Sequence, residues 1–312
     1  MEIMPEKILI TPKSYYDIRH RMEAFWAGFE VIYNDTGKAL TEAEMAERIA
    51  DVDGLLVGID PVSRRVVEKA GRLRAISKYG AGIDNIDLES IAERKISLKT
   101  TPGANSVSVA ELTLGLLFLL ARNIWESART VKEGGWKRPQ GIEITGKTIG
   151  LVGCGNIGRE GALRAKGLCM TVLVYDPYFH DDDFMVKHAI EKVTIDELLT
   201  RSDFVSLHLP LTEETKGIID RPRLEMMNPG SHLINTARGE LIDEDDLLWA
   251  LKNGRISGAA CDVLTKEPPG SHPLLKLDNF ILTPHMGANT REAVLRTARA
   301  ATDNLIEMLK SG

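Results

Sequence analysis

Residues 147–176 read KTIGLVGCGNIGREGALRAKGLCMTVLVYD, and this stretch decides the fold of the second half of the chain. The short apolar run KTIGLVG leads into three spaced glycines, Gly153, Gly155 and Gly158, and the helical pattern GREGALRAKGL follows. A bare glycine motif also marks ordinary turns. A strand before it and a helix after it, however, predict a βαβ unit of a doubly wound parallel sheet.

Each glycine of this loop has a backbone task. Gly153 permits the tight turn, Gly155 lets the main chain approach a pyrophosphate, and Gly158 allows close packing of helix on strand. The phosphates would then meet the positive end of the helix. We therefore predict a dinucleotide site that includes Asn156 and Ile157 of the same loop.

Asp176 indicates which dinucleotide binds. It ends the strand TVLVYD, where a carboxylate accepts hydrogen bonds from the adenosine ribose hydroxyls and repels a 2'-phosphate. Pro177 and Tyr178 follow, so no Arg or Lys stands beside it to attract that phosphate. The prediction is NAD in preference to NADP.

The rest of the chain shows the same α/β rhythm in two series. Short β-rich runs alternate with helical patterns from Lys7 to Thr101, including one helix expected near 15–29. Two helices are expected at 107–122 and 124–133 before the second series, and a last helix at 290–309 should pack back against the first series. We therefore predict a Rossmann NAD-binding domain, residues 104–287, inserted in a substrate domain of residues 1–103 plus 288–312.

Composition excludes several classes of protein. The 312 residues carry 45 acidic and 39 basic side chains, and the basic ones form no stripe, so neither nucleic acid nor an anionic membrane is an expected partner. The N-terminus MEIMPEKILIT has no leader pattern, and the apolar run 112–121 is too short to cross a bilayer. We expect a cytoplasmic protein.

No metal site is expected. The cysteines, Cys154, Cys169 and Cys261, form no CxxC pair and are expected to be buried thiols. The run HDDDF, residues 180–184, is interpreted as a solvated loop rather than as a set of metal ligands.

Polar residues at the ends of the later strands are the candidates for chemistry. SHLINTA runs into Arg238, ISGAACDV runs to Asp262 and then Glu267, and NFILTP runs into His285. Singly, each has an ordinary structural explanation: a turn cap, a solvated acid, a satisfied core histidine. Together, a guanidinium that grips a carboxylate, an imidazole that moves a proton and a carboxylate that orients the imidazole suit a 2-hydroxy acid.

The sequence also resembles a known family over essentially its whole length. The stretches that carry the resemblance are KYGAGIDNID (78–87), NSVSVAE (105–111), GKTIGLVGCGNIG (146–158), HLPLTEETKG (208–217), INTARGELIDEDDL (234–247), GAACDVLTKEPP (258–269) and TPHMGANTREA (283–293). They are similar to those of the D-isomer-specific 2-hydroxyacid dehydrogenases. The resemblance implies a flavodoxin-like substrate domain, a homodimer formed through the helices at 107–133, and an NAD-dependent oxidoreductase acting on CH–OH groups.

The resemblance also implies residue roles. Arg238, Glu267 and His285 would form the catalytic triad, and the loop Tyr79, Gly80, Ala81 and Gly82 would touch the substrate carboxylate through backbone amides. Asp262 would face the nicotinamide carboxamide. Other residues implied to bind the cofactor, besides the glycine loop, Asp176, Arg238 and His285, are Val109, His208, Pro210, Thr215, Thr236 and Ala237.

Within the family, KYGAGIDNID and HMGANT are most similar to the 3-phosphoglycerate dehydrogenase branch, which makes 3-phosphoglycerate and serine biosynthesis the first expectation. That branch commonly offers an Arg for the substrate phosphate where this chain has Gly58 to Asp60. Arg64, Arg65 or Arg138 are the possible substitutes. The chain stops where the catalytic core stops, so no appended regulatory domain is expected.

Three alternatives stay open. The first is a hydroxypyruvate or glyoxylate reductase. The second, from a different class, is an NAD-responsive binding protein similar to transcriptional co-repressors that keep this fold. The third is a relative acting on another small anion such as formate or phosphite, against which the Arg238, Glu267 and His285 set argues.

Overall fold

The computed structural model describes residues 5–311, which divide into two compact units. Unit 1 combines the chain up to Asn105 with the part from Asn289 onward, and unit 2 runs from Ser106 to Ala288. The sequence-based boundaries, 103/104 and 287/288, lie within two residues of these. The first four residues of the N-terminal stretch, for which no leader is expected, lie outside the described residues, as does residue 312.

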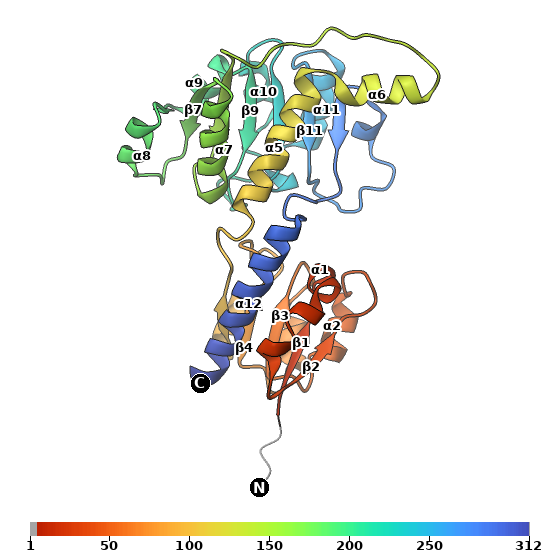
Figure 1. The fold of residues 1–312 in the computed structure, drawn as a ribbon, viewed down its shortest axis with the longest axis vertical. Coiled ribbons are helices and arrows are strands. Elements are labelled where there is room, and N and C mark those ends of the chain that lie inside the picture. The colour runs from red at the N-terminus through yellow and green to blue at the C-terminus, as the bar shows by residue number, and fades with distance from the viewer. Residues whose placement is uncertain (1–4, 312) are drawn as a thin grey trace. The chain divides into compact units, whose positions relative to one another are not determined.

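Unit 1 contains a five-stranded parallel sheet in the order β2-β1-β3-β4-β5, the order of flavodoxin-like folds (Figure 1). Its strands are β1 (Glu6–Ile10), β2 (Phe29–Tyr33), β3 (Gly54–Val57), β4 (Ala75–Lys78) and β5 (Ser97–Lys99). Its helices are α1 (Lys13–Asp17), η1 (Arg19–Arg21), η2 (Glu23–Trp26), α2 (Glu42–Arg48), α3 (Arg64–Lys69), α4 (Leu88–Glu93) and α12 (Arg291–Ser311).

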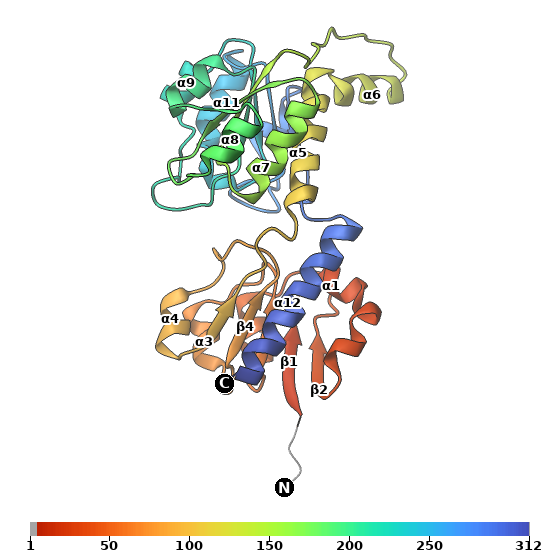
Figure 2. The same ribbon diagram turned by 60° about the vertical axis from the view of Figure 1, so that its left-hand side comes forward.

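Alternation along the strands of unit 1 explains why both faces of its sheet are covered. On β1, Leu9 faces one core together with Met45 of α2, whereas Ile8 faces a second core together with Leu305 of α12. Successive strand residues point to opposite faces, so a buried parallel strand must be apolar throughout. Helix α12 lies across the second face (Figure 2). The C-terminal helix therefore packs against the first series of strands, as the sequence predicted.

Unit 2 contains a seven-stranded parallel sheet in the order β12-β11-β10-β9-β6-β7-β8. Its strands are β6 (Thr148–Val152), β7 (Thr171–Tyr175), β8 (Glu191–Lys192), β9 (Phe204–Leu207), β10 (His232–Asn235), β11 (Gly258–Cys261) and β12 (Phe280–Leu282). Its helices are α5 (Ser106–Ala121), α6 (Ile124–Lys132), α7 (Asn156–Gly167), α8 (Asp182–Lys187), α9 (Ile195–Arg201), α10 (Arg221–Met226), η3 (Gly239–Leu241), α11 (Glu244–Lys252) and η4 (Pro273–Lys276). The predicted fold class, two doubly wound parallel sheets, is confirmed.

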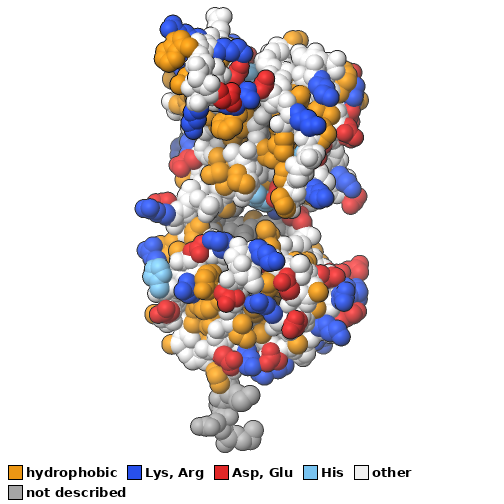
Figure 3. Space-filling model, turned by 90° about the vertical axis from the view of Figure 1, so that its right-hand side faces the viewer, with side chains coloured by type: hydrophobic (Ala, Val, Ile, Leu, Met, Phe, Trp, Pro, Cys, Tyr) orange, Lys and Arg blue, Asp and Glu red, His pale blue; other side chains and the backbone are white. Residues whose placement is uncertain are grey.

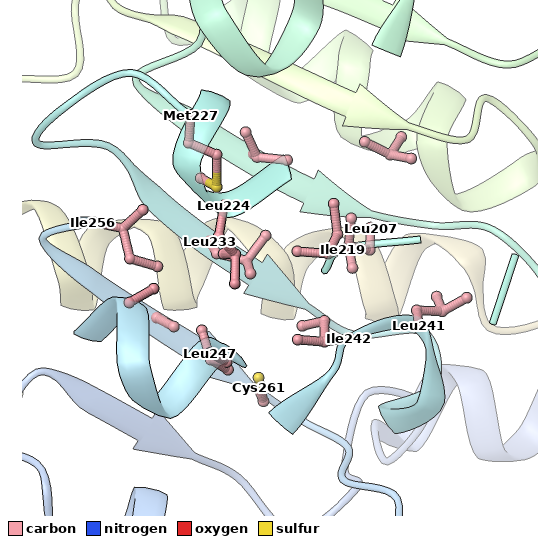
Figure 4. Close-up of a cluster of buried hydrophobic side chains, with 14 of the residues drawn as sticks. Leu207, Ile219, Leu224, Met227, Leu233, Leu241, Ile242, Leu247, Ile256 and Cys261 are labelled. Atoms are coloured by element: carbon pink, nitrogen blue, oxygen red, sulfur yellow. The ribbon is translucent and has the colours of Figure 1, made fainter. Parts of the chain in front are cut away.

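The core of unit 2 holds the strand ends in place. Leu233 of β10 packs with Leu224 of α10 and Leu247 of α11 on one face of the sheet (Figure 4). Ile234, the next residue, belongs to the cluster on the opposite face, where α5 and α7 pack. Because the strand order reverses between β6 and β9, the carboxyl ends of these two strands form the switch point at which open α/β sheets bind ligands.

The single helix expected near residues 15–29 is wrong, since the segment forms α1, η1 and η2 instead. Trp26 Nε1 donates to the Tyr15 hydroxyl over 2.8 Å. In a straight helix, residues eleven positions apart would lie about 16 Å apart along the axis. The chain must therefore bend so that these two buried side chains meet.

Two smaller expectations are also corrected. The HDDDF run is not a loop throughout, because Asp181 caps α8 by accepting a hydrogen bond from the Phe184 amide at 3.0 Å. Acidic residues are favourable in a first helical turn, which explains the run of three. Among the thiols, Cys154 and Cys261 are buried, but Cys169 is exposed in the turn between α7 and β7.

The surface agrees with the composition. Figure 3 shows positive and negative side chains interspersed over the visible face, with no continuous basic stripe. No single described helix is long and apolar enough to span a bilayer, although the bent pair α5 and α6 passes the same test when taken together. Much of α5 is buried within unit 2.

Candidate active site

The glycine loop fits a dinucleotide pyrophosphate. Gly153 has φ +106°, and a Cβ there would lie 2.8 Å from the His208 carbonyl oxygen. A Cβ on Gly158 would lie 2.2 Å from the Gly153 oxygen, whereas one on Gly155 would meet nothing within 4 Å. Gly155 is the N-cap residue of α7, and no side chain there accepts a hydrogen bond from the first amides of the helix. These amides can therefore donate to a bound anion. Asn156 and Ile157 begin α7 and present its first turn to this space.

Asp176 is fixed beside this loop. It follows β7, and its two carboxylate oxygens accept the amides of Cys154 at 2.8 Å and Tyr178 at 2.9 Å. Each carboxylate oxygen has a second lone pair, so the group can still accept ribose hydroxyls. The residues present therefore fit the adenosine part of NAD.

The segment after β9 lies against the glycine loop. The His208 amide donates to the Val152 carbonyl over 2.8 Å, which continues the strand pairing past the switch point. Burial lowers the pKa of His208 to about 4, so its ring is neutral at neutral pH. Within residues 5–311 its Nδ1 has no hydrogen-bond partner. Thr215 Oγ1 donates to the Pro210 carbonyl at 2.7 Å and thereby closes the following turn.

The segment after β10 presents Arg238. Asn235 is fully buried and holds both sides of the turn, because its Oδ1 accepts the Ala237 amide at 3.0 Å and its Nδ2 donates to the Arg238 carbonyl at 2.7 Å. Arg238 Nη1 donates to the Ala237 carbonyl at 2.7 Å. Thr236 hydrogen-bonds Thr113 of α5 at 3.0 Å. The backbone that carries the guanidinium is therefore fixed on several sides.

Asp262 organises the segment that carries His285. Its carboxylate accepts the amides of Met286 at 2.9 Å and Gly287 at 2.7 Å and the hydroxyl of Thr283, and it is 2% exposed. The His285 amide donates to the Asp262 carbonyl at 2.9 Å. Val109 of α5 packs on the same segment, since a Cβ on Gly287 would lie 3.3 Å from it.

His285 adopts φ +50°, which is unusual for a residue with a side chain. Such backbone strain costs on the order of 1–3 kcal/mol and persists only where neighbouring contacts enforce it. The hydrogen bonds to Asp262 supply that enforcement. Strain of this kind concentrates at functional sites, which agrees with the role predicted for this histidine.

His285 and Glu267 form the pair expected from the sequence. Nδ1 of His285 lies 2.7 Å from Oε2 of Glu267, and the side chains are 44% and 36% exposed. Glu267 Oε1 accepts the Leu264 amide at 3.1 Å. With Nδ1 directed at the carboxylate, Nε2 is the ring atom left to exchange a proton with a ligand.

The electrostatics of the pair favour a charged imidazole. The hydrogen bond from Glu267 raises the pKa of His285, burial opposes this, and the charges of Glu267 and Asp262 raise it further. Burial raises the pKa of Glu267, but the hydrogen bond and charge of His285, the Leu264 amide and the charge of Arg238 lower it overall. The pair therefore holds a proton on the imidazole to a higher pH than an isolated histidine would.

In unit 1, the loop Tyr79–Gly82 follows β4. The Tyr79 amide donates to the Val57 carbonyl at 2.8 Å, and the Gly80 amide donates to Thr101 Oγ1 at 2.9 Å. Within residues 5–311 the amides of Ala81 and Gly82 have no partner, so these two are the ones able to bind an anion. This narrows the sequence-based expectation, which named all four.

Two of the arginines considered as phosphate ligands are already engaged with acids. Arg64 Nη1 lies 2.8 Å from Glu93, and Arg65 Nη1 lies 3.6 Å from Glu42. In unit 2, Arg138 lies 6.0 Å from the centre of the Trp136 ring. Gly58 to Asp60 contribute no cation, and Asp60 is a buried acid that accepts the Leu40 amide at 2.7 Å.

Three polar residues close to the site in the sequence or the fold were not singled out from the sequence: Asn235, Glu244 and His272. Asn235 and Glu244 stand in the quoted stretch INTARGELIDEDDL, next to the arginine that drew attention. Asn235 contacts the backbone two and three residues further along, a local turn pattern that Asn favours and that could have been noticed in the sequence. Glu244 contacts Thr265 and His272, which only folding brings near. In the described part of the chain, no group of three His, Cys, Asp or Glu side chains could hold a metal ion.

Fold and site together define a class: an α/β protein whose second unit is a dinucleotide-binding sheet with a histidine–carboxylate pair and an arginine after its later strands. Residues 114–287 match the model of the "D-isomer specific 2-hydroxyacid dehydrogenase, NAD binding domain". The chain belongs to the D-isomer specific 2-hydroxyacid dehydrogenase family, and its cofactor is NAD.

Individual relatives agree on the family and differ in substrate. The chain is 42% identical over 308 residues, 97% of its length, to a D-3-phosphoglycerate dehydrogenase of Methanocaldococcus jannaschii, of which it covers 57%. It is 39% identical to a hydroxypyruvate reductase of Thermotoga maritima, over 88% of this chain and 90% of that one. The NAD-bound 3-phosphoglycerate dehydrogenase of Entamoeba histolytica superposes with TM-score 0.82 at 30% identity, over 99% of this chain and 96% of that one.

The chain spans about half the length of the first two curated relatives, 57% and 48%, both D-3-phosphoglycerate dehydrogenases. It spans 80% or more of the hydroxypyruvate and glyoxylate reductases among its relatives. The names of these relatives thus divide between a phosphorylated substrate and unphosphorylated ones.

Proposed function

We propose that the protein is an NAD-dependent dehydrogenase that interconverts a small D-2-hydroxy acid and its 2-oxo acid. The observation that carries the proposal is the 2.7 Å hydrogen bond between His285 and Glu267. This hydrogen bond engages Nδ1 and leaves Nε2 of the partly exposed imidazole available for proton exchange. His285 lies in unit 2, which matches the NAD-binding domain of the family. A structural histidine would have no need of strained backbone at the surface.

His285 and Arg238 divide the work on the substrate. In the reductive direction His285, protonated, donates its Nε2 proton to the carbonyl oxygen of the 2-oxo acid; in oxidation it takes the hydroxyl proton. Glu267 stabilises the charged ring and keeps Nδ1 engaged. The Arg238 guanidinium binds the substrate carboxylate with two parallel hydrogen bonds and stabilises negative charge on the carbonyl oxygen. When bound, the nicotinamide supplies or accepts the hydride at the carbon that bears this oxygen.

The remaining site residues are proposed in supporting roles. Ala81 and Gly82 would donate backbone amides to the substrate carboxylate, within the loop that also contains Tyr79 and Gly80. Asp262 would face the nicotinamide carboxamide while it holds the His285 segment. The residues proposed to contact the cofactor are Val109, Gly153, Gly155, Asn156, Ile157, Gly158, Asp176, His208, Pro210, Thr215, Thr236, Ala237, Arg238 and His285.

For the substrate, we name 3-phosphohydroxypyruvate first, because two relatives at 42% and 41% identity are D-3-phosphoglycerate dehydrogenases. A second candidate, hydroxypyruvate or glyoxylate, is favoured by a specific observation. Arg64 and Arg65 lie 2.8 Å and 3.6 Å from the carboxylates of Glu93 and Glu42, whose negative charges disfavour a phosphate at these two arginines.

The experiment is a set of initial rates of NADH oxidation with 3-phosphohydroxypyruvate, hydroxypyruvate, glyoxylate and pyruvate, with NADPH in parallel. A kcat/KM at least about tenfold higher for the phosphorylated acid, or about 1.4 kcal/mol in transition-state binding, would support the first candidate. The reverse preference would support the second. No turnover of any 2-oxo acid, together with NAD-dependent binding of a protein, would favour the co-repressor-like alternative.

We also propose that two copies of the chain associate through α5 and α6. Several large apolar side chains there are exposed, including Trp125 at 54%, Val131 at 50% and Phe118 at 36%. Exposed apolar side chains gathered on neighbouring helices are typical of subunit interfaces. The molar mass measured by light scattering would be about twice 34.4 kDa for a homodimer.

A further inference from the structure

Unit 2 contains a second histidine–carboxylate pair, formed by His272 and Glu244. Nε2 of His272 lies 2.9 Å from Oε2 of Glu244, and the two side chains are 22% and 19% exposed. Glu244 is the first residue of α11, and His272 caps η4. Neither is among the residues proposed above to contact cofactor or substrate.

The backbone fixes the tautomer of His272. Its Nδ1 accepts the Leu274 amide at 3.3 Å, so this nitrogen carries no proton. The ring proton is then on Nε2, which donates to Glu244. The pair is a directed hydrogen bond that requires no charge on the imidazole.

The other oxygen of Glu244 holds a different point of the chain. Oε1 accepts the Thr265 amide at 2.7 Å. One carboxylate thus anchors both ends of the segment Thr265–His272, and Glu267 lies inside that segment. The neighbouring amides of Leu264 and Thr265 point to two different carboxylates, Glu267 and Glu244.

This anchoring matters because, within residues 5–311, residues 266 and 268–271 take part in no hydrogen bond, and Pro268 and Pro269 fix only their own φ angles. Residues 265–271 form no helix or strand, and most of them are exposed. An irregular exposed segment samples many backbone conformations unless specific contacts restrict it. Anchors at its two ends restrict the positions that the Glu267 carboxylate can take.

We propose that Glu244 and His272 are positioning residues that act through Glu267, by holding the segment Thr265–His272 so that the Glu267 carboxylate meets Nδ1 of His285. The inference rests on the proposed function, in which His285 exchanges the proton. The groups of unit 2 that face His285 are Glu267, Asp262 and Arg238, and Glu244 reaches it only through the first of these.

The chemistry of the pair offers graded variants. Glu244→Ala removes both anchors. Glu244→Gln keeps one oxygen acceptor, so either the Thr265 amide or the His272 N–H loses its partner. Asp245→Asn is the matched control, because Asp245 is the next residue of α11, is exposed and carries the same charge. Within residues 5–311 its carboxylate accepts no hydrogen bond.

The first measurement needs no turnover. The Cε1 proton of His285 is followed by NMR against pH in the cofactor-free protein, with the signal assigned by its loss in His285→Ala. We expect the His285 pKa to fall in Glu244→Ala, to fall less in Glu244→Gln and to stay unchanged in Asp245→Asn. An unchanged His285 pKa in a folded Glu244→Ala or Glu244→Gln protein would overturn the inference.

The second measurement is a double-mutant cycle on kcat with the preferred 2-oxo acid. Glu244→Ala should lower kcat between about tenfold and a hundredfold, the cost of misplacing a catalytic group by about 1 Å. In a Glu267→Gln background the same substitution should change kcat less than about twofold, because the residue it acts through is gone. Equal losses in both backgrounds would show that Glu244 only supports the fold.

The two proposals can fail separately. If neither the unmodified protein nor Asp245→Asn reduces any 2-oxo acid, the proposed function is wrong, and the NMR titration alone decides whether Glu244 positions Glu267. If both reduce the acid and Glu244→Ala does so equally well at every pH, the proposed function stands and the positioning role is refuted.

Discussion

Gly239 and Leu264 approach so closely that a Cβ on Gly239 would lie 2.1 Å from the Leu264 carbonyl carbon. Gly239 follows Arg238, and the Leu264 amide donates to Glu267. The backbones that carry the proposed substrate-binding cation and the proposed orienting carboxylate therefore touch directly. Only a residue without a side chain permits this contact.

Gly239→Ala tests this contact. Overpacking of this kind typically costs about 1–3 kcal/mol, so the free energy of unfolding in urea should fall by that amount. The kcat/KM for the 2-oxo acid should fall with it. Gly161→Ala is the control: a Cβ there meets nothing within 4 Å, so kcat/KM should not change. Because Gly161 lies inside α7, the free energy of unfolding should rise by about 0.5–1 kcal/mol, the opposite of the Gly239→Ala effect. Full activity and stability in Gly239→Ala would contradict the assigned contact.

His285→Ala should lower kcat by about a hundredfold to ten-thousandfold, the usual contribution of a general acid or base. NADH affinity, measured by fluorescence titration, should change little. If a folded His285→Ala protein lost NADH affinity instead of kcat, His285 would serve mainly to bind the cofactor, and its role as general acid and base would be refuted.

Glu267→Gln should move the pH profile. The reductive step needs protonated His285, so kcat/KM for the 2-oxo acid falls as pH rises through the His285 pKa. Glu267 raises that pKa from the ordinary value of 6.5. Without the carboxylate the fall should begin at lower pH, whereas the oxidative direction should retain activity to lower pH. Identical profiles for the two proteins would refute the pairing.

Arg238→Lys should chiefly impair the substrate. A lysine ammonium keeps the charge but cannot reproduce the two parallel hydrogen bonds of a guanidinium. Loss of one charge-assisted bond, worth about 1.5–3 kcal/mol, corresponds to a fall in kcat/KM of roughly tenfold to a hundredfold. Initial rates against oxo-acid concentration give this number, and an unchanged kcat/KM would remove Arg238 from the mechanism.

Asp176→Asn should narrow the preference for NADH over NADPH. The substitution removes the charge that repels a 2'-phosphate while keeping the shape of the side chain. We expect the ratio of the kcat/KM value with NADH to that with NADPH to fall by about tenfold. This is the change in rate that corresponds to the free energy of one charge-assisted hydrogen bond. A ratio equal to that of the unmodified protein would mean that another group selects the cofactor.

Local pattern predicted much of this molecule. The strand, glycine loop and helix around Gly153 have the periodicity and spacing of a βαβ unit, and the alternation of β-rich runs with helical patterns in both halves of the chain predicted the two sheets. The segment from Tyr15 to Trp26 did not follow, because its bends arise from a hydrogen bond between residues eleven positions apart. Local propensity cannot report such a contact.

The site shows the same division. Arg238, Glu267 and His285 stood out as chemically able residues at strand ends, and the His285 and Glu267 side chains do meet. Glu244 and His272 did not stand out, because they lie 28 positions apart in the sequence and meet only in the fold. Asn235 was not singled out although its turn contacts are local. A carboxylate next to three other acids in a helix N-terminus is indistinguishable, in sequence, from ordinary helix capping.

The discontinuous composition of unit 1 has a consequence for biosynthesis. The face of its sheet that bears Ile8 and Ile10 is completed by Ala298, Ala301 and Leu305 of α12, which the ribosome makes only after the whole of unit 2. While unit 2 is being synthesised, this apolar face of the unit 1 sheet lacks the helix that covers it in the complete chain. Unit 2, whose residues are contiguous, can fold first, and unit 1 is finished last although it was begun first.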